Sequence, residues 1–330
     1  MLRRTKGFLR SLSIWMRRPP LGPATPREIA LIKELRAQCR RLPDRDVSGN
    51  SQAENTWAQV LNYFRYLVAT QDPRRFLTWD HLQTMVVGNA GYVDEELGYL
   101  RQRKDWSQRW SEAIEESSVG QPRAFPAYPQ SSGNLIHHAY HLCRFGEMTG
   151  KLVESFDFVV EFGGGYGSMC RLFHRLGFRG RYAIFDFAEF SSLQQFFLKS
   201  LDLPLHSIES FRQTSHGIVT VSDIAQLEGL TTELLPASQR SLFIATWSLS
   251  ETSLELRRKV LDLASSFDAF LFAYQDRFGE VDNDRFFTDW KMTKPDTQWH
   301  QWSIDHISGN YYLMGQRIQL TESVDREPAV

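Results

Sequence analysis

The stretch from Phe158 to Gly167 constrains the fold of this 330-residue chain more than any other. It reads FVVEFGGGYG, an apolar run that contains the acid Glu161 and leads into a glycine-rich loop. A short, continuously apolar run predicts a strand that is buried on both faces of a parallel sheet. Glycine permits a sharp turn and lets a ligand approach the backbone closely. We therefore expect a strand, a ligand-binding turn and a helix that begins at Ser168.

Two nucleotide-binding patterns fit parts of this loop. The dinucleotide fingerprint G-x-G-x-x-G uses Gly163 and Gly165, but Ser168 stands where its third glycine belongs. The spacing E-x-G-x-G-x-G is complete, in Glu161, Gly163, Gly165 and Gly167. It resembles motif I of class I S-adenosylmethionine-dependent methyltransferases. The resemblance implies that the loop, Gly164 included, passes under the methionine part of that cofactor, and a glycine-rich turn without a ligand is the alternative.

A second acid follows the next predicted strand. The strand covers residues 181–185, and Asp186 stands directly after it, about 20 residues beyond the glycine loop. This is the separation at which a βαβ unit presents an acid to ribose hydroxyls, and an ionised carboxylate accepts hydrogen bonds from both of them. Asp186 and its neighbour Phe187 are therefore predicted cofactor contacts. Alternatively, Asp186 caps a helix over residues 189–200.

Strands and helices continue to alternate after this point. Further strands are predicted at residues 217–221, 242–246 and 269–274, with a helix over 252–265. Residues 299–304 and 310–318 have the pattern of a terminal hairpin. The predicted fold is a Rossmann-like, doubly wound α/β sheet with a terminal antiparallel hairpin, which is typical of class I methyltransferases. The resemblance adds Ser222 and Asp223 as adenine contacts and Thr246 and Trp247 as cofactor contacts.

The N-terminal part of the chain is predicted to be helical. A capping box, Thr25 to Glu28, opens a helix towards Cys39, and further helices are expected over residues 57–68, 74–85 and 95–116. Residues 119–133 are predicted to be a loop. The expected organisation is a basic amphipathic arm (1–22), a helical region with its loop (23–133), a cofactor-binding domain (134–320) and a C-terminal tail (321–330).

Four segments narrow the resemblance to the family of sugar O-methyltransferases of bacterial surface polysaccharide and lipopolysaccharide assembly. They read GNLIHHAYHL (133–142), EFGGGYG (161–167), TWSLSE (246–251) and GNYYLMG (309–315). The resemblance implies a sugar or glycan acceptor. A methyltransferase for another small molecule, a nicotinamide-dependent oxidoreductase and a non-catalytic scaffold with the same fold remain alternatives.

Methyl transfer to a hydroxyl group requires a base that removes its proton. Glu251 follows the fourth predicted strand and is a candidate, as are His137, His138 and His306. Alternatively, Ser248 to Glu251 form a capping box for the next helix. His137 and His141 share a helix face, but no third ligand stands nearby in the sequence, so we expect no metal site.

Composition limits the possible partners. The net charge is −1, with 38 basic and 39 acidic residues, which disfavours nucleic acid as a partner. Three isolated cysteines indicate a reducing compartment such as the cytoplasm. Residues 1–18 hold six bases, no acid and several large apolar residues, which predicts peripheral contact with the inner membrane face or a glycosyltransferase. A disordered terminus is the alternative, and the oligomeric state stays open.

Overall fold

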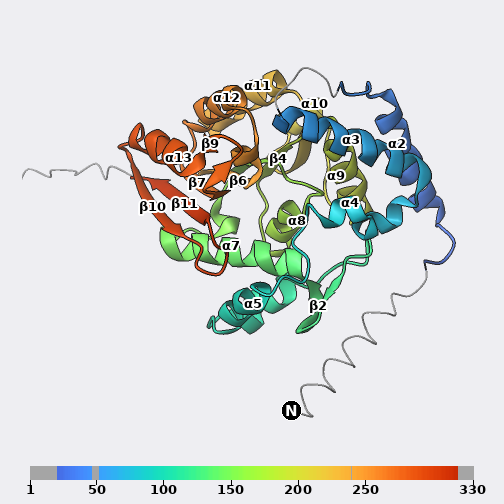
Figure 1. Ribbon diagram of the computed structural model, residues 1–330, viewed down its shortest axis with the longest axis horizontal. Helices are drawn as coiled ribbons and strands as arrows, with labels where there is room; N and C mark the ends of the chain where they lie inside the picture. Colours follow the sequence, from blue (N-terminus) through green and yellow to red (C-terminus); the bar gives the residue numbers. More distant parts are fainter. Residues whose placement is uncertain (1–20, 47–51, 239, 319–330) are drawn as a thin grey trace, which may run out of the picture.

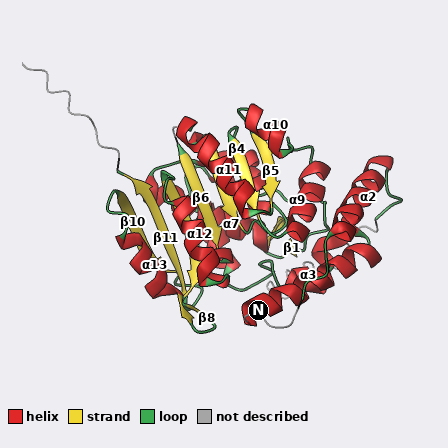
Figure 2. Ribbon diagram, turned by 90° about the horizontal axis from the view of Figure 1, so that it is seen from above, coloured by secondary structure: helices red, strands yellow, loops and turns green. Residues whose placement is uncertain are grey.

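A seven-stranded sheet forms the centre of the molecule, for which the computed structural model describes residues 21–46, 52–238 and 240–318 (Figures 1 and 2). The strand order is β10-β11-β7-β6-β3-β4-β5. The strands from β3 to β7 are parallel to one another, whereas β11 runs antiparallel between β7 and β10. Their bounds are β3 Phe158–Phe162, β4 Arg181–Phe185, β5 Gly217–Val221, β6 Ser241–Thr246, β7 Ala269–Gln275, β10 Thr297–Ser303 and β11 Asn310–Arg317.

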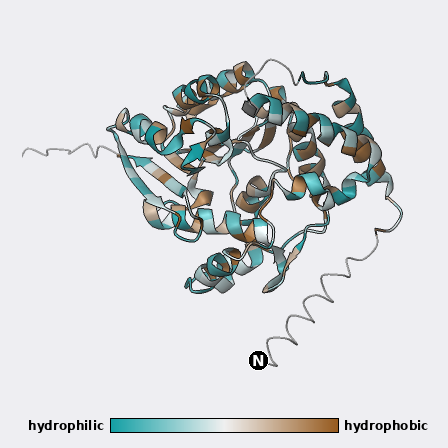
Figure 3. Ribbon diagram, viewed as in Figure 1, coloured by the Kyte–Doolittle hydropathy of each residue, from teal (hydrophilic) through white to brown (hydrophobic). Residues whose placement is uncertain are grey.

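Two helical layers cover this sheet because its strands present apolar side chains to both faces. On β3, for instance, Val159 packs in one core cluster while Val160 packs in the other. One layer holds α7 Gly133–Thr149, α8 Ser168–Arg175 and α9 Ala188–Ser200. The other holds α10 Ile208–Gln213, α11 Ile224–Leu234, α12 Leu254–Ala264 and α13 Asn283–Met292. Figure 3 shows hydrophobic residues concentrated on the inner elements and hydrophilic ones at the periphery.

The predicted fold class is confirmed. Sequence order reverses at β3, whose neighbours are β4 on one side and β6 on the other, as in a doubly wound sheet. The inserted antiparallel strand β11 is the feature that distinguishes class I methyltransferase sheets from most dinucleotide-binding ones. The domain therefore has the class I methyltransferase fold, with a helical region at its N-terminal end.

The N-terminal helices pack on the outside of the α7–α9 layer, beside α9 and α7 (Figure 1). The capping box is present: the Thr25 side chain accepts from the N–H of Glu28, and the Glu28 carboxylate accepts from the N–H of Thr25. It opens α2 Pro26–Arg41, and α3 Gln52–Thr70 contains the second predicted helix. Leu35 of α2 and Phe64 of α3 are fully buried in the same core cluster as the sheet residue Val159.

Three predictions in this region are wrong. The helix expected over residues 74–85 is a 3-10 turn, η1 Pro73–Thr78, followed by the short helix α4 Asp80–Gln83. The helix expected over 95–116 is divided into α5 Val93–Arg101, the π-helical turn η2 Trp106–Trp110 and α6 Ser111–Ala113. The expected loop contains a small hairpin, β1 Ala124–Phe125 and β2 Tyr128–Ser132. In the first two cases tertiary packing overrides the local apolar spacing, and in the third a pairing of two short strands forms within a segment rich in proline and glycine.

The remaining elements are short. They are the 3-10 turns η3 Val153–Ser155, η4 Leu235–Ala237 and η5 Ser248–Glu251, and a two-stranded ribbon of β8 Arg277–Phe278 and β9 Val281–Asp282. The capping box expected at Ser248 is also wrong, because Ser253 caps α12 by accepting from the N–H of Leu256. In the described parts of the chain, no helix is both long and apolar enough to span a bilayer.

Candidate functional site

The candidate site is a cavity of about 850 Å³ at the carboxyl ends of the parallel strands. Ligands of open α/β sheets bind at this edge, where the strand order reverses. The glycine loop, the residues that follow β4 and β6, and the start of α7 form one part of its lining. The N-terminal helical region forms the rest. The cavity therefore combines the two predicted parts of the chain.

Glycine at position 163 is required by a close approach of two strand ends. Its φ is +73°, and a Cβ atom there would lie 2.2 Å from the Cβ of Ser248, which follows β6. The Ser248 hydroxyl donates a hydrogen bond to the carbonyl oxygen of Phe162, at the end of β3. Gly165 also has positive φ, +57°, but a Cβ there would meet nothing within 4 Å. The loop thus presents bare backbone to open space at this position.

Glu161 is a buried acid at the base of the loop. Its side chain is 4% exposed and accepts a hydrogen bond of 2.9 Å from the Tyr182 hydroxyl. Burial raises the pKa of this carboxyl to about 8, since the Tyr182 hydrogen bond only partly offsets the desolvation and Asp186 opposes a second negative charge.

Asp186 touches the loop directly. Its carboxylate accepts hydrogen bonds from the N–H groups of Gly165 (3.0 Å) and Phe187 (2.8 Å) and from the Gln194 side chain (3.0 Å). Burial raises the pKa of Asp186 to about 7, although these donors lower it. Asp186 does not cap α9, whose N-cap is Phe187 and has no side-chain cap. The structure therefore favours the predicted ligand-facing position over the capping alternative.

The two acids face the cavity without a cation. Among the described residues, no lysine or arginine forms an ion pair with Glu161 or Asp186. Arg45, a described arginine that lines the cavity, is held by Glu189 through two hydrogen bonds of 2.9 and 3.0 Å. Without a cation beside them, these carboxyls are costly to ionise, which is why the pKa values of both are raised. A ligand that carries positive charge and hydroxyl donors would lower that cost.

The N-terminal region supplies the opposite wall. Trp57 of α3 packs on Phe187 with ring centroids 5.4 Å apart, and Tyr92 and the segment 84–88 also line the cavity. Asn134 fixes that segment, since its side chain accepts from the N–H of Val87 (3.1 Å) and donates to the Tyr166 hydroxyl (3.2 Å). This wall is thereby tied to the glycine loop, in which Tyr166 lies.

The histidines of α7 line the cavity beside Trp247. The rings of His137 and Trp247 are stacked at 5.3 Å, and His137 Nδ1 lies 2.7 Å from the Glu96 carboxylate. His138 also lines the cavity, but its Nδ1 is buried without a hydrogen-bond partner. Burial lowers the pKa of His138 to about 3, and charge repulsion from His137 adds to this effect. His138 is therefore neutral at physiological pH.

Trp247 and Glu251 follow β6. Trp247 has a φ of 62°, unusual for a residue with a Cβ, and its indole N–H donates to Asn310 at 2.6 Å. Glu251 lines the cavity at half-buried depth. Burial raises the pKa of the Glu251 carboxyl, and a hydrogen bond from Gln275 partly lowers it again. A carboxyl group with a raised pKa can accept a proton from a ligand.

The structure brings most of the predicted residues together. The predicted residues that line the cavity are Glu161, Gly163, Gly164, Gly165, Asp186, Phe187, Ser222, Thr246, Trp247, Glu251, His137 and His138. Gly167 does not line it but begins α8 as its N-cap, with a φ of +96°. Asp223 caps α11 by accepting from the N–H of Gln226. His306 lies behind the lining, with its Nε2 2.9 Å from the Glu96 carboxylate.

Sequence analysis missed Glu96, which is fully buried between these histidines. A signal was present, because Glu96 lies among Val93, Leu97 and Leu100 on the buried face of α5. An acid on an apolar helix face requires a buried partner. Arg45 and Asn134 were also missed, and for them the sequence carries no comparable signal, because their roles depend on contacts between distant segments.

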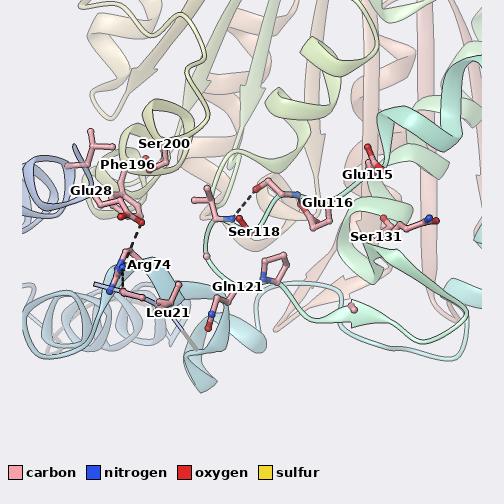
Figure 4. A pocket seen from close by; sticks show the side chains of 18 of the residues that line it. Leu21, Glu28, Arg74, Glu115, Glu116, Ser118, Gln121, Ser131, Phe196 and Ser200 are labelled. Carbon is pink, nitrogen blue, oxygen red and sulfur yellow. Dashed lines mark hydrogen bonds and ion pairs between the residues drawn. The ribbon is translucent and has the colours of Figure 1, made fainter. Parts of the chain in front are cut away.

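A second cavity, of about 690 Å³, lies between α2, η1, residues 115–122 and the carboxyl-terminal half of α9 (Figure 4). Its charged side chains have partners: Arg74 contacts Glu28 and Asp72, and Glu116 contacts Arg171. The rings of Phe76, Tyr166 and Phe197 pack together with centroids 5.0 to 6.0 Å apart, and Tyr166 lines the first cavity but not the second. Among the described residues that line this cavity, the charged side chains are thus occupied by one another or by neighbouring ion-pair partners.

Comparisons with known proteins give limited further information. No protein-family model matches the sequence, and no curated protein does. Among solved structures, an O-methyltransferase family protein from Burkholderia thailandensis is 12% identical to this chain, with a TM-score of 0.35. The alignment covers 88% of this chain and 94% of the Burkholderia chain. A precorrin-6y C5,15-methyltransferase from Geobacter metallireducens is also 12% identical, with a TM-score of 0.35, and the alignment covers 54% of this chain and 86% of the Geobacter chain. Because these scores are low, the fold assignment rests on the strand order itself.

The raised pKa of Glu161 predicts that the free energy of unfolding of the ligand-free protein depends on pH. The folded state holds this proton more tightly than the unfolded chain, so stability falls as pH rises from the unfolded value, near 4.3, to about 8. Glu161→Gln keeps an acceptor for Tyr182 but cannot ionise. The stability of the variant relative to wild type should grow over this window, by at most about 1.4 kcal/mol per pH unit, and level off above it.

Urea unfolding of the ligand-free proteins at several pH values measures this difference. Glu228→Gln, at an exposed position of α11, is the matched control and should show no such trend. A difference between Glu161→Gln and wild type that stays constant from pH 5 to pH 8 would show that Glu161 does not titrate in this range.

Proposed function

We propose that this protein is an S-adenosylmethionine-dependent O-methyltransferase that acts on a sugar hydroxyl. The observation that carries the proposal is the pair of carboxyls on either side of the glycine loop, the buried Glu161 and the half-buried Asp186, neither of which forms an ion pair with a described lysine or arginine. S-adenosylmethionine carries a sulfonium, an ammonium group and two ribose hydroxyls. This combination of positive charge and hydroxyl donors matches the acceptors that the cavity presents.

Several residues are suited to hold the cofactor. The bare backbone at Gly165 leaves room for it, and Asp186 is placed to accept from ribose hydroxyls. Phe187 and Ser222 follow β4 and β5 and offer a ring face and a hydroxyl beside them. Glu161 faces the loop from below and, when ionised, would favour the positive end of the ligand.

The loop is less suited to a dinucleotide. A pyrophosphate group requires free N–H donors at the start of the helix. Here the N–H of Gly163 donates to Phe185, that of Gly165 to Asp186 and that of Gly167 to Gly164, at 2.7, 3.0 and 2.9 Å. The pKa values of Glu161 and Asp186 are raised, and a phosphate beside them would raise them further, whereas a cationic ligand would favour their ionised forms. These contacts support the methyl-donor proposal over the nicotinamide-dependent alternative.

The acceptor side is the part of the cavity around α7, η5 and the N-terminal wall. When bound, the cofactor supplies an electrophilic methyl group, and the protein must orient a hydroxyl and remove its proton. His137, His138 and Glu251 are the titratable groups on this side. The rings of Trp57 and Tyr92 offer flat apolar faces, a common counterpart of sugar rings. This mixture of rings and polar acceptors supports a sugar acceptor.

We expect the purified protein to bind S-adenosylmethionine, as measured by calorimetry. Asp186→Ala should weaken binding by about 1.5–3 kcal/mol, or about 10- to 150-fold in Kd, because hydrogen bonds to a charged acceptor are lost. Asp276→Ala is the matched control, since Asp276 is an exposed acid just after the neighbouring strand β7. Equal effects of the two substitutions would show that Asp186 makes no specific contact with the cofactor. Absence of binding to the wild type would contradict the cofactor assignment.

The sugar part of the proposal has its own test. The wild type is incubated with S-adenosylmethionine and, separately, with UDP-glucose, UDP-galactose, GDP-mannose, dTDP-rhamnose and a bacterial lipid-linked glycan fraction. We expect one of these to gain a single methyl group, detected by mass spectrometry. Catechol serves as a non-sugar hydroxyl acceptor. Methylation of catechol without methylation of any sugar would assign a different acceptor class while leaving methyl transfer intact.

Residues 1–18 lie outside the described part of the chain, and their role is a separate proposal. Their six bases and interleaved apolar residues suit an anionic membrane surface, at about 1 kcal/mol for each base near it. We accordingly propose the cytoplasmic side of the inner membrane as the site of action. We expect the full chain to bind phosphatidylglycerol vesicles at low salt and to lose this binding when residues 1–18 are deleted. Unchanged binding after deletion would exclude this role.

A further inference from the structure

A buried carboxylate joins two histidines behind the acceptor side of the cavity. Glu96 of α5 is 0% exposed, and its Oε1 lies 2.7 Å from His137 Nδ1 and 2.9 Å from His306 Nε2. Its other oxygen, Oε2, is buried and has no hydrogen-bond partner among the described residues. Three distant segments therefore meet at one oxygen atom: α5, α7 and the loop between β10 and β11.

The shared oxygen determines where the histidine protons lie. Burial alone would raise the pKa of Glu96, but hydrogen bonds and charge from His137 and His306 hold it below its ordinary value. Glu96 is thus ionised at neutral pH, and an ionised carboxylate only accepts hydrogen bonds. Both ring nitrogens next to it must donate. His137 therefore carries its proton on Nδ1, and the lone pair of Nε2 is left for the cavity that His137 lines.

We propose that Glu96 is a positioning residue that holds His137 in the Nδ1–H form, so that His137 Nε2 is the base for the acceptor hydroxyl. This inference rests on the proposed methyl transfer and deepens it by assigning the base. The two histidines thereby have different roles. His137 lines the cavity on the acceptor side, whereas His306 does not line it and donates to the same oxygen of Glu96.

The proton balance of the step is simple. As the acceptor oxygen forms its bond to the methyl carbon, the S–CH₃ bond breaks with its electron pair going to sulfur. The hydroxyl proton passes to His137 Nε2, and His137 becomes a cation. The anionic Glu96 stabilises this cation across Nδ1, as a carboxylate does for the histidine of a hydrolytic triad. The proton is afterwards released to solvent, and no further reactant is required.

The other groups that face His137 are neutral at physiological pH. Tyr92 lies 5.7 Å away between ring centroids, and burial raises its pKa to about 12. His141 lies 4.1 Å away, bonds the Tyr312 hydroxyl through Nδ1 and has its pKa lowered well below the ordinary value by burial. His138 is neutral for the same reason. The negative charge next to His137 thus comes from Glu96.

Two rival bases line the same cavity. His138 is a poor proton acceptor, because burial lowers its pKa to about 3. Glu251 is the stronger rival, since its carboxyl has a raised pKa and lines the acceptor side. The described side chain that hydrogen-bonds Glu251 is that of Gln275, which is neutral. Glu251 therefore lacks an ionised partner of the kind that Glu96 provides for His137. The tests below distinguish Glu251 from the pair of Glu96 and His137.

The first test needs no acceptor. Protein labelled with ¹⁵N-histidine is studied by NMR with S-adenosylhomocysteine bound, and His137 is assigned from the spectrum of His137→Asn. We expect the Nδ1–H form for His137 in the wild type and a mixture of both forms in Glu96→Gln. An Nε2–H form in the wild type would overturn the inference.

The second test uses the sugar acceptor identified above and measures kcat and KM at several pH values. Glu96→Gln should lower kcat by about 10²-fold or more, in the range of general-base catalysis, with little change in the Kd for S-adenosylmethionine. The acidic limb of its pH–rate profile should move to lower pH. Glu96→Asp should restore part of the rate. In His137→Asn, adding Glu96→Gln should cost little more, because Glu96 acts through His137.

Two controls separate catalysis from folding. Glu116→Gln removes another largely buried carboxylate, which bonds Ser132 and Arg171 away from this cavity, and it should leave the pH–rate profile in place. Glu251→Gln should have a smaller effect on kcat than Glu96→Gln. The opposite order, or a full Glu96→Gln effect in His137→Asn, would overturn the inference. A wild type that binds no S-adenosylmethionine would instead contradict the proposed function.

Discussion

The close approach of the ends of β3 and β6 is the constraint on which the site depends. The strand order reverses here, so the polypeptide must turn away from the sheet on both sides of one crevice. Gly163 leaves no room for a side chain against Ser248, and the Ser248 hydroxyl closes the gap by bonding Phe162. Glu161 lies beneath this junction and is buried by it. The close contact between the ends of β3 and β6 thus determines how the glycine loop and Glu161 are placed in the cavity.

Sequence patterns predict what is local. The fold class, the strands β3 to β7, the terminal hairpin and the acids Glu161 and Asp186 were recognised because each depends on a short apolar run and the residues directly after it. Predictions failed where contacts between distant segments determine helix boundaries and caps. The helix expected over 95–116 breaks into three pieces, and Ser253 rather than Ser248 caps α12. The apolar face of α5 indicates that Glu96 needs a buried partner, but His137 and His306 are up to 210 residues away, so the sequence does not indicate which residues those partners are.

The N-terminal helical region completes the cavity. Arg45, just after α2, holds Glu189 at the start of α9 and lies over the Phe187 ring at 5.2 Å. Asn134 holds the segment 84–88 against the loop that contains Tyr166. Without these contacts the cofactor side of the sheet would be open to water, in which electrostatic interactions are weak. Enclosure of the site is therefore the physical role of this region.

The two halves of the cavity differ in how the chain encodes them. In the proposed function, the cofactor half is built mainly from one contiguous stretch, residues 161–187, whereas the acceptor half is assembled from α3, α5, α7, η5 and the turn after β10. Changes to that turn or to α5 reach His137 through Glu96 but touch no residue of the glycine loop. Acceptor preference can thus be re-engineered, or can drift during evolution, by exchanging peripheral segments while the donor half stays unaltered.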